Sequence, residues 1–301
     1  MSSIPLKILA IINPISGGKK KSHIPRLLNK HINHNKIQLT IAFSKNHEHV
    51  SQLTLEAIKE NVDAIIAVGG DGTINTIAKH IVKTKIALGI IPMGSGNGLA
   101  NELGISKKIK KAINIINNFY VEPIDCGRVN NHVFLNILGT GFDAQIGYRF
   151  NNNKTRGLFG YIVAVIKQLF NFTKTEINVE YNNNKFLYKN LFLATVGNGT
   201  QFGNNAYITP KAKVNDGLLN LTVVTNINII NALKLTYALF SRNFKYCENF
   251  CYMHTSTEFK IKRLSKEPVN IDGECEVMNE LLDIIVEPKA INLIIPYKNE
   301  Q

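Results

Sequence analysis

The sequence predicts two domains of different class, an α/β domain with a parallel sheet followed by a β-rich antiparallel sandwich. The chain has 301 residues, and one domain usually takes roughly 100 to 200. Its first part alternates short β-branched runs with helix-like segments, which is the rhythm of parallel strands joined by crossover helices. After about Gly127 the pattern changes to near-alternating apolar runs broken by Asn, Gly and Asp. Such runs are typical of antiparallel sheets.

The elements follow from hydrophobic periodicity and turn residues. In the first domain we expect strands at 7–12, 36–43, 63–68 and 86–91, with helices at 22–30, 48–60 and 74–82. In the second we expect strands at 133–138, 176–181, 186–196, 218–224, 257–261 and 281–286, and amphipathic helices at 158–170 and 228–240. The expected domains are 1–127, with the tail 288–301 packing back on it, and 128–287.

Composition narrows the function classes. The chain is 45% hydrophobic and 19% charged with a net charge of +13, so it has enough apolar residues for cores and favours anionic partners. Arginine, which base recognition uses most, stands at only six positions, so we expect no nucleic acid partner. The four cysteines show no C-x-x-C spacing, which indicates reduced thiols in a cytosolic protein. The N-terminus lacks the charged and apolar regions of a signal peptide, and the apolar stretches fall short of the about 20 residues that span a bilayer.

Three glycine-containing loops follow the expected parallel strands, where ligands bind in open α/β sheets. They are Asn13 to Lys19, Gly69 to Thr73 and Pro92 to Gly98. Glycine permits positive φ and close backbone approach, and the helix start that follows each loop favours anions. A Walker A loop would need Gly at position 13, where the chain has Asn13. A Rossmann fingerprint would need Gly at position 99, where the chain has Leu99, so neither motif is present. Taken singly, each loop is also an ordinary turn.

Together these loops resemble the diacylglycerol kinase, sphingosine kinase and ceramide kinase family, which includes bacterial lipid kinases. The resemblance rests on Asn13-Pro14 with Ser16-Gly17-Gly18, on Gly69 to Thr73 with Asn75, and on Gly94 to Asn97. It continues through Asp125-Cys126-Gly127, Leu138 to Asp143, the segment 210–219 and Asp272-Gly273-Glu274, and so covers nearly the whole chain.

The resemblance implies ATP in a cleft between the domains, with Mg²⁺ and a lipid acceptor. The nucleotide residues that it implies are Asn13, Ser44, Gly69, Gly70, Asp71, Gly72, Thr73, Asn75, Gly94, Ser95, Gly96 and Asn97. Asp71 would act through Mg²⁺, and Glu274 would be the general base, with Asp272 as the alternative carboxylate. A second Mg²⁺ would be held by Asp216 and the backbone carbonyls of Lys213 and Leu218.

One departure leaves the acceptor open. Bacterial diacylglycerol kinases usually have Asp where this chain has Gly98, and that Asp joins a network with the residues that match Asp71, Asp125 and Asp216. The pattern here is nearer to the sphingoid-base kinases. The remaining alternatives are NAD kinase, which shares GGDGT, and a non-catalytic nucleotide- or membrane-binding protein on the same scaffold.

Basic clusters such as 19–21 and 107–111 are either solvated faces or contacts to an anionic bilayer. We therefore expect a cytoplasmic protein in peripheral contact with anionic membrane, and we leave a homodimer open as its assembly. His47 and His49 lack a third metal ligand nearby in the sequence.

Overall fold

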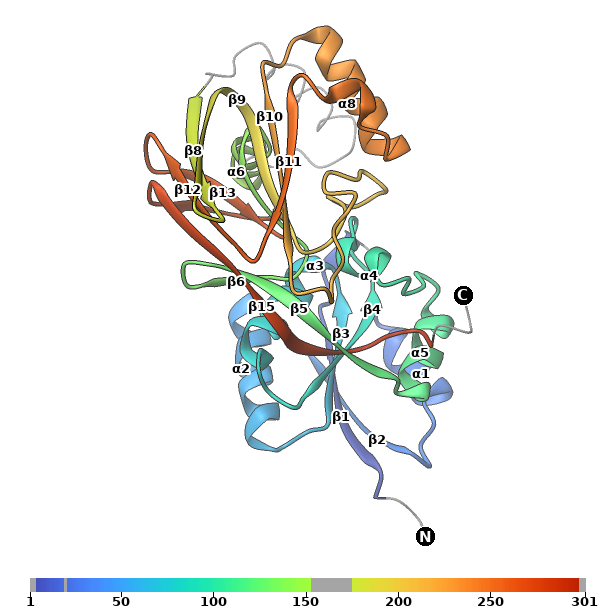
Figure 1. The fold of residues 1–301 in the computed structure, drawn as a ribbon. Helices are drawn as coiled ribbons and strands as arrows, with labels where there is room; N and C mark the ends of the chain where they lie inside the picture. Colours follow the sequence, from blue (N-terminus) through green and yellow to red (C-terminus); the bar gives the residue numbers. More distant parts are fainter. Residues whose placement is uncertain (1–3, 19–20, 153–174, 298–301) are drawn as a thin grey trace. The chain divides into compact units, whose positions relative to one another are not determined.

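The computed structural model describes residues 4–18, 21–152 and 175–297. The chain divides into two compact units, Met1–Cys126 with Pro288–Gln301, and Gly127–Glu287. It passes from the first unit to the second along β5 (Val121–Val129) and returns along β15 (Leu281–Ile294), as Figure 1 shows. The helix expected at 158–170 lies outside the described residues.

The first unit is built on a parallel sheet. Its strands are β1 (Leu6–Ile12), β2 (Ile37–Phe43), β3 (Ala64–Gly69) and β4 (Ala87–Pro92), in the order β2-β1-β3-β4. The end of β15 continues the sheet beside β4, also in parallel, with Leu293 opposite Leu88. Every residue of β3 and β4 is buried, as expected of parallel strands that are covered on both faces.

Helices cover both faces of this sheet: α1 (Ile24–His31), α2 (His47–Lys59), α3 (Asp71–Ile81), α4 (Gly98–Glu102) and α5 (Ile109–Asn118). Helix α2 packs on α3 and α1 packs on α5, and Figure 1 shows the two pairs on opposite sides of the sheet. Helix α3 begins at Asp71, three residues before the expected start, because Gly70 is its N-cap and the Gly70 carbonyl accepts the amides of Thr73 and Ile74. Together, these elements are the α/β domain that the sequence predicts.

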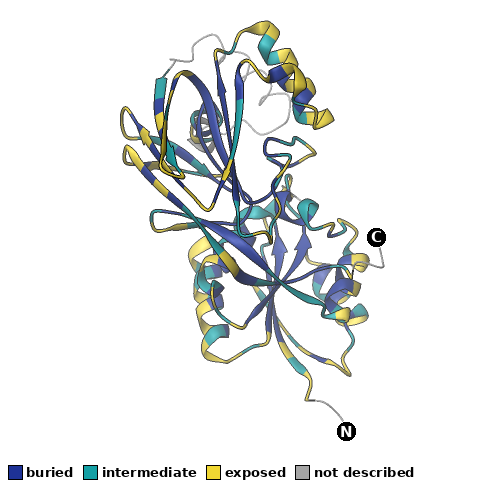
Figure 2. Ribbon diagram, in the orientation of Figure 1, coloured by how far each residue is buried: buried dark blue, intermediate teal, exposed yellow. Residues whose placement is uncertain are grey.

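The second unit is an antiparallel β structure. Its strands are β6 (His132–Phe134), β7 (Ile137–Gly141), β8 (Thr175–Tyr181), β9 (Asn184–Gly197), β10 (Leu219–Thr225), β11 (Cys251–Ser256), β12 (Glu258–Arg263), β13 (Glu267–Ile271) and β14 (Glu274–Met278). The long strand β9 pairs with β8 through its first half, and with β7 and β10 through its second half. Side chains from most of these strands meet in one core that includes Phe134, Val196, Leu221, Phe259 and Ile284. Strands β7 and β10 and the second half of β9 are buried throughout, whereas β12 alternates between buried and exposed residues (Figure 2).

Among its described residues the second unit also has the α-helices α6 (Phe142–Asn152) and α8 (Ile229–Ser241). Helix α8 matches the expected segment 228–240, and the side chain of Asn228 caps it by accepting the amide of Asn231 at 2.8 Å. Both helices pack on a second core cluster, to which Cys247 and Cys251 also belong. Both cysteines are buried free thiols.

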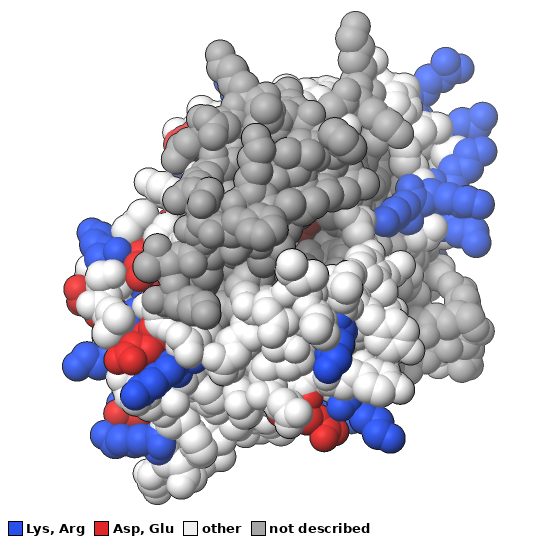
Figure 3. Space-filling model, turned by 90° about the horizontal axis from the view of Figure 1, so that it is seen from above, with Lys and Arg blue, Asp and Glu red and all other residues white. Residues whose placement is uncertain are grey.

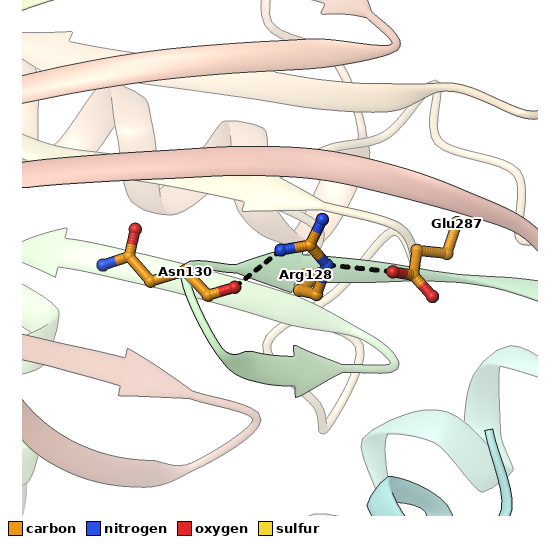
Figure 4. Close-up of polar contacts among 3 residues, drawn as sticks. All are labelled: Arg128, Asn130 and Glu287. Atoms are coloured by element: carbon orange, nitrogen blue, oxygen red, sulfur yellow. Dashed lines mark hydrogen bonds and ion pairs between the residues drawn. The ribbon is translucent and has the colours of Figure 1, made fainter.

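An ion pair joins β5 and β15 within the second unit. Arg128 donates from Nε to Glu287 Oε1 at 2.9 Å and from Nη1 to the carbonyl oxygen of Asn130 at 2.7 Å (Figure 4). Asn130 in turn exchanges hydrogen bonds with the backbone of Asp283. The two segments where the chain enters and leaves this unit are therefore held to each other by side chains.

Candidate active site

The three glycine loops of the first unit are in direct contact at the carboxyl edge of the sheet. A Cβ at Gly17 would lie 2.3 Å from the carbonyl oxygen of Met93, and one at Gly94 would lie 2.5 Å from Cα of Gly70. Both distances are far below van der Waals contact. Gly17 also has a φ of 63°, in the left-handed region that glycine adopts without strain. Glycine is thus required at these positions because the loop backbones touch one another.

Side-chain amides hold the loops in place. Asn13 Nδ2 donates to Thr73 Oγ1 at 3.1 Å and so joins the first loop to α3. Asn97, buried and with a φ of 51°, accepts the amide of Gly94 at 2.8 Å and donates to the Gly94 carbonyl at 2.8 Å. Asparagine tolerates this left-handed conformation better than most residues. Ser95, which lies between Gly94 and Asn97 at the tip of the third loop, is exposed.

Asp71 lies at the junction of the second and third loops. A Cβ at Gly96 would be 3.1 Å from its Oδ2. Burial raises the pKa of the Asp71 carboxyl, while hydrogen bonds from the backbone of Gly98, Asn97 and Leu99 lower it. The carboxylate is therefore directed at the start of α4. The backbone of Asp71 itself adds a fourth such bond, so the carboxylate is held in place by the loop and helix amides around it.

Two further expected nucleotide residues have different surroundings. Asn75 has a buried Nδ2 with no hydrogen-bond partner among the described residues. Such a donor fits a ligand oxygen, because unpaired buried donors are costly. Ser44 is buried, and its hydroxyl lies 3.4 Å from the Ile12 carbonyl oxygen. Its hydrogen is thus directed into the sheet, and a nucleotide contact through Ser44 stays a prediction.

In the second unit, Asp272 and Gly273 form the turn of the β13–β14 hairpin. Their φ angles are 51° and 97°, and Ile271 pairs with Glu274 across the turn. Positive φ at both central residues is the type I′ geometry that Asp-Gly favours. Glu274 is the first residue of β14 and is exposed.

The carboxylate of Asp272 is occupied within the fold. Its Oδ1 accepts the amides of Asn136 and Ile137 at 2.9 and 2.7 Å, and its Oδ2 accepts the amide of Leu135 at 2.6 Å. These bonds lie between β6 and β7, which explains why the single strand expected at 133–138 is two strands in the structure. The geometry favours a structural role for Asp272 and leaves Glu274 as the exposed carboxylate of the hairpin tip.

The expected metal loop is a surface turn. Asp216 is exposed, and its Oδ1 accepts the amide of Leu218 at 3.1 Å, while Gly217 has a φ of 73°. Lys213 is exposed and Leu218 half-buried. The donor set of one carboxylate and two carbonyls consists of hard oxygens, which fits Mg²⁺ in kind. In the described part of the chain, no group of three His, Cys, Asp or Glu side chains could hold a metal.

Comparison with known proteins agrees with these features. Residues 7–129 match the family model described as diacylglycerol kinase catalytic domain, and residues 136–295 match the YegS C-terminal NAD kinase beta sandwich-like domain. A diacylglycerol kinase of Mycobacterium tuberculosis is 30% identical over 246 residues, which cover 78% of this chain and 78% of that protein. The chain belongs to the diacylglycerol kinase family. The family expected from the motifs is thereby confirmed.

Other relatives agree. A diacylglycerol kinase of Bacillus subtilis is 31% identical over 226 residues, 73% of each chain. A crystal structure of a diacylglycerol kinase from Bacillus anthracis superposes with a TM-score of 0.78 over 96% of this chain and 97% of that one, at 24% identity. That similarity shows a common fold. The chain therefore carries a lipid kinase catalytic domain followed by the family's β-sandwich-like domain.

The resemblance implies a network of acidic residues that includes positions 125 and 98, and the surroundings of Asp125 and Gly98 differ. Asp125 is buried, and its Oδ1 accepts the amide of Lys289 at 2.7 Å, so this carboxylate binds the returning strand β15 to the first unit. Gly98 is buried, and its backbone hydrogen-bonds to Asp71. A backbone donor therefore stands where the resemblance implies an acidic side chain.

Lys21 is a residue whose role the sequence pattern missed. Grouped with 19–20 it looks like part of a solvated basic cluster, but its side chain is 2% exposed and Nζ donates to the carbonyl oxygen of Ser16. Burial lowers the pKa of its ammonium group. Lys21 thus braces the first glycine loop from within. Lys21 stands at the end of the loop, three residues before α1. This position is the sequence signal that could have distinguished its structural role from that of residues 19–20.

Asp143 and Asn270 form a second feature that the motifs did not reveal. Both carboxylate oxygens of Asp143 are buried, and neither has a hydrogen-bond partner of ordinary geometry among the described residues. Burial raises its pKa to about 7, against the opposing effects of the backbone of Ala144 and Asp143 and of the Asn270 side chain. Asn270 Oδ1 accepts the amide of Gly273 at 2.9 Å. Asn270 therefore connects the buried acid to the turn that carries Glu274.

Proposed function

We propose that the chain is an ATP- and Mg²⁺-dependent lipid kinase that phosphorylates the primary hydroxyl of diacylglycerol or a related membrane lipid. The observation that supports this most is the contact of three glycine loops at one sheet edge, with Asp71 among them. Loops of this kind bring backbone amides close to phosphate groups. The family relationship supplies the lipid acceptor as the first class to test.

The first unit would bind the nucleotide. Gly70 caps α3 without a side-chain hydrogen bond, so amides of the first turn can donate to phosphate oxygens. The positive end of the helix favours the charge of those oxygens. The unpaired Nδ2 of Asn75 would donate to the nucleotide. Magnesium would neutralise phosphate charge, and Asp71 would hold it directly or through bound water.

The second unit would supply the base. In the proposed reaction the acceptor O–H bond breaks, and its proton passes to the Glu274 carboxylate. The acceptor oxygen bonds to the γ-phosphorus as the bond from that phosphorus to the bridging oxygen of ADP breaks. A hydroxyl is a poor nucleophile at neutral pH, so a positioned carboxylate is worth roughly 10²- to 10⁴-fold in rate. Asp216, with the carbonyls of Lys213 and Leu218, would hold a second Mg²⁺.

We further propose peripheral contact with anionic membrane. The net charge is +13, and Figure 3 shows Lys and Arg side chains on both sides of the face that it draws, with Asp and Glu beside those on the left but not beside those at the upper right. Among the described helices none has the length and apolar character needed to cross a bilayer. Contact through charge would depend on ionic strength, because the Debye length is about 8 Å at physiological salt.

A lipid panel tests the proposal. The protein is incubated with labelled ATP, Mg²⁺ and, separately, diacylglycerol, sphingosine, ceramide and NAD. We expect label in diacylglycerol and none in NAD. Transfer to NAD alone would contradict lipid kinase function and support the NAD kinase alternative, and no transfer with retained ATP binding would support a non-catalytic binding protein.

A sphingoid-base kinase is the second candidate function. Gly98 supports it, because the sequence of this loop is nearer to that group than to the diacylglycerol kinases with Asp. Preferential labelling of sphingosine in the same panel would favour it.

A further inference from the structure

Helix α8 has two apolar faces. Leu235 and Ala238 are buried in the core cluster beneath it. The other face carries large apolar side chains that are 55% to 70% exposed: Ile229, Ile230, Leu233, Tyr237 and Phe240. At about 100° per residue these five fall within one arc of about 100°. Figure 2 shows α8 mostly in the colour of exposed residues.

This face is unusual for a surface helix, whose outward side is normally polar. Tyr246, 59% exposed, extends it and meets Tyr237 edge to face with ring centroids 6.3 Å apart. Contiguous apolar patches of this kind mark binding surfaces for proteins or membranes.

The charges around the face select between these partners. From Leu218 to Cys247 the chain has no Asp or Glu, whereas Lys234, Arg242 and Lys245 are all exposed. Arg242 lies over the ring of Tyr207 at 3.6 Å, and Arg242 and Lys245 line a shallow pocket together with Lys211, Phe244 and Glu248. A face of large apolar side chains flanked by cations is the pattern of helices that lie in the membrane interface.

A second copy of the chain fits this face less well. In a two-fold dimer the same patch meets itself, so Lys234 and Arg242 would approach the cations of the other copy. Like charges at an interface oppose association. An anionic bilayer supplies both an apolar interior and the opposite charge.

We propose that the outward face of α8 docks on an anionic lipid bilayer. Ile230, Leu233 and Phe240 enter the boundary between headgroups and acyl chains, and Lys234, Arg242 and Lys245 contact lipid phosphates. The inference rests on the proposed function in that the acceptor lipid lies in such a bilayer, but docking needs no catalysis and is measured without ATP.

The absence of tryptophan from the chain provides a direct probe. Phe240→Trp places a single indole on α8, and Leu55→Trp places one at a 45% exposed leucine of α2 as a matched control. With vesicles of phosphatidylcholine and phosphatidylserine, the emission of Phe240→Trp shifts to shorter wavelength and that of Leu55→Trp does not. An unshifted Phe240→Trp spectrum, or an equal shift in both variants, overturns the inference.

Vesicle sedimentation measures the strength of docking. Leu233→Gln with Phe240→Gln removes two buried apolar groups from the bound state and is expected to weaken binding roughly tenfold or more. Lys234→Gln weakens it about fivefold, since one cation near an anionic surface is worth about 1 kcal/mol. The controls Leu55→Gln and Lys59→Gln on α2 leave binding unchanged. Equal binding by all variants contradicts the inference.

Two further measurements distinguish membrane docking from dimerisation and from catalysis. Sedimentation velocity without lipid tests for a dimer: a wild-type dimer that Leu233→Gln with Phe240→Gln dissociates, with vesicle binding unaltered, assigns the face to a second copy and overturns the inference. Phosphorylation of a short-chain, water-dispersed diacylglycerol tests the proposed function by itself. Protein that docks through α8 and phosphorylates no lipid overturns the proposed function alone, and protein that phosphorylates this substrate without docking overturns the α8 inference alone.

Discussion

The carboxylate of Asp272 accepts the backbone amide of Ile137 at 2.7 Å, across 135 residues of sequence. With the amides of Leu135 and Asn136 it makes three such bonds. Hydrogen bonds to an ionised group are stronger than neutral ones. The side chain therefore fastens the hairpin tip to the segment between β6 and β7, and this determines where Glu274 projects.

Asp272→Asn tests that role. Asparagine tolerates the φ of 51°, so the variant removes the charge and one set of acceptor sites without straining the turn. We expect a loss of about 1–3 kcal/mol in the free energy of unfolding, the usual cost when a charged partner of buried amides is lost. Urea denaturation measures it. Unchanged stability together with a large fall in turnover would return Asp272 to the role of base.

Asp71→Asn tests nucleotide placement. The change removes the charge that would hold Mg²⁺ and leaves one acceptor oxygen for the amides at the start of α4. We expect turnover to fall by roughly 10²-fold or more with weakened Mg·ATP binding, in the range of losses when an electrostatic partner of the reaction is removed. Steady-state kinetics at varied ATP measures both.

The control for Asp71 is Asp63→Asn. Asp63 belongs to the same unit and accepts the amide of Lys7 at 2.7 Å, at the start of β3 and thus away from the carboxyl edge. Comparable losses in both variants would mean that charge in this unit supports folding rather than nucleotide binding.

Asp216→Asn tests the proposed second metal. A neutral oxygen replaces an anionic ligand, so half-maximal activation should need several-fold more Mg²⁺. Asparagine can still accept the amide of Leu218, so the turn is kept. A titration that superposes on the wild type would show that Asp216 and Gly217 form only a turn.

Asp143→Asn should change how stability depends on pH. The pKa of Asp143 is raised to about 7 in the folded protein, so between about pH 4 and 7 the folded state holds a proton that the unfolded state has released. Wild-type stability therefore falls as pH rises through this window, by roughly 1.4 kcal/mol per unit of pKa shift. Cys275 nearby has a pKa raised to about 12 and stays neutral there.

The variant lacks this titration. Asp143→Asn should be more stable than the wild type at pH 8 and close to it at pH 4, by urea unfolding at each pH. A constant difference between the two proteins over this range would show that Asp143 does not titrate in it.

Much of the fold could be predicted from the sequence, because parallel strands and their crossover helices have strong local patterns. Strands β1 and β2 end at Ile12 and Phe43 as expected, and β9 ends at Gly197, one residue beyond the expected end at Val196. The short strands β13 and β14 escaped prediction, since five residues with charged neighbours carry too weak a pattern. The break between β6 and β7 could not be predicted, because its cause is a carboxylate more than 130 residues away.

In the candidate site, too, some features could be predicted from the sequence and others could not. The glycine loops have a local signature, and their contacts explain why Gly17, Gly70 and Gly94 bear no side chain. Burial of a single ionisable side chain has no such signature. Lys21 and Asp143 are buried, but the residues next to them in the sequence do not predict it. The outward apolar face of α8 was likewise hidden, because an amphipathic pattern shows that one face is apolar but not which face meets solvent.

Glu274→Gln tests the central claim most directly. Its control is Glu276→Gln, an exposed glutamate two residues along β14 that lies 3.3 Å from His132 Nδ1. If Glu274 takes the proton of the acceptor, its replacement lowers turnover by roughly 10²- to 10⁴-fold with ATP affinity nearly unchanged, while Glu276→Gln stays close to the wild type. Turnover of Glu274→Gln within about threefold of the wild type, against the loss that a general base implies, would contradict the account.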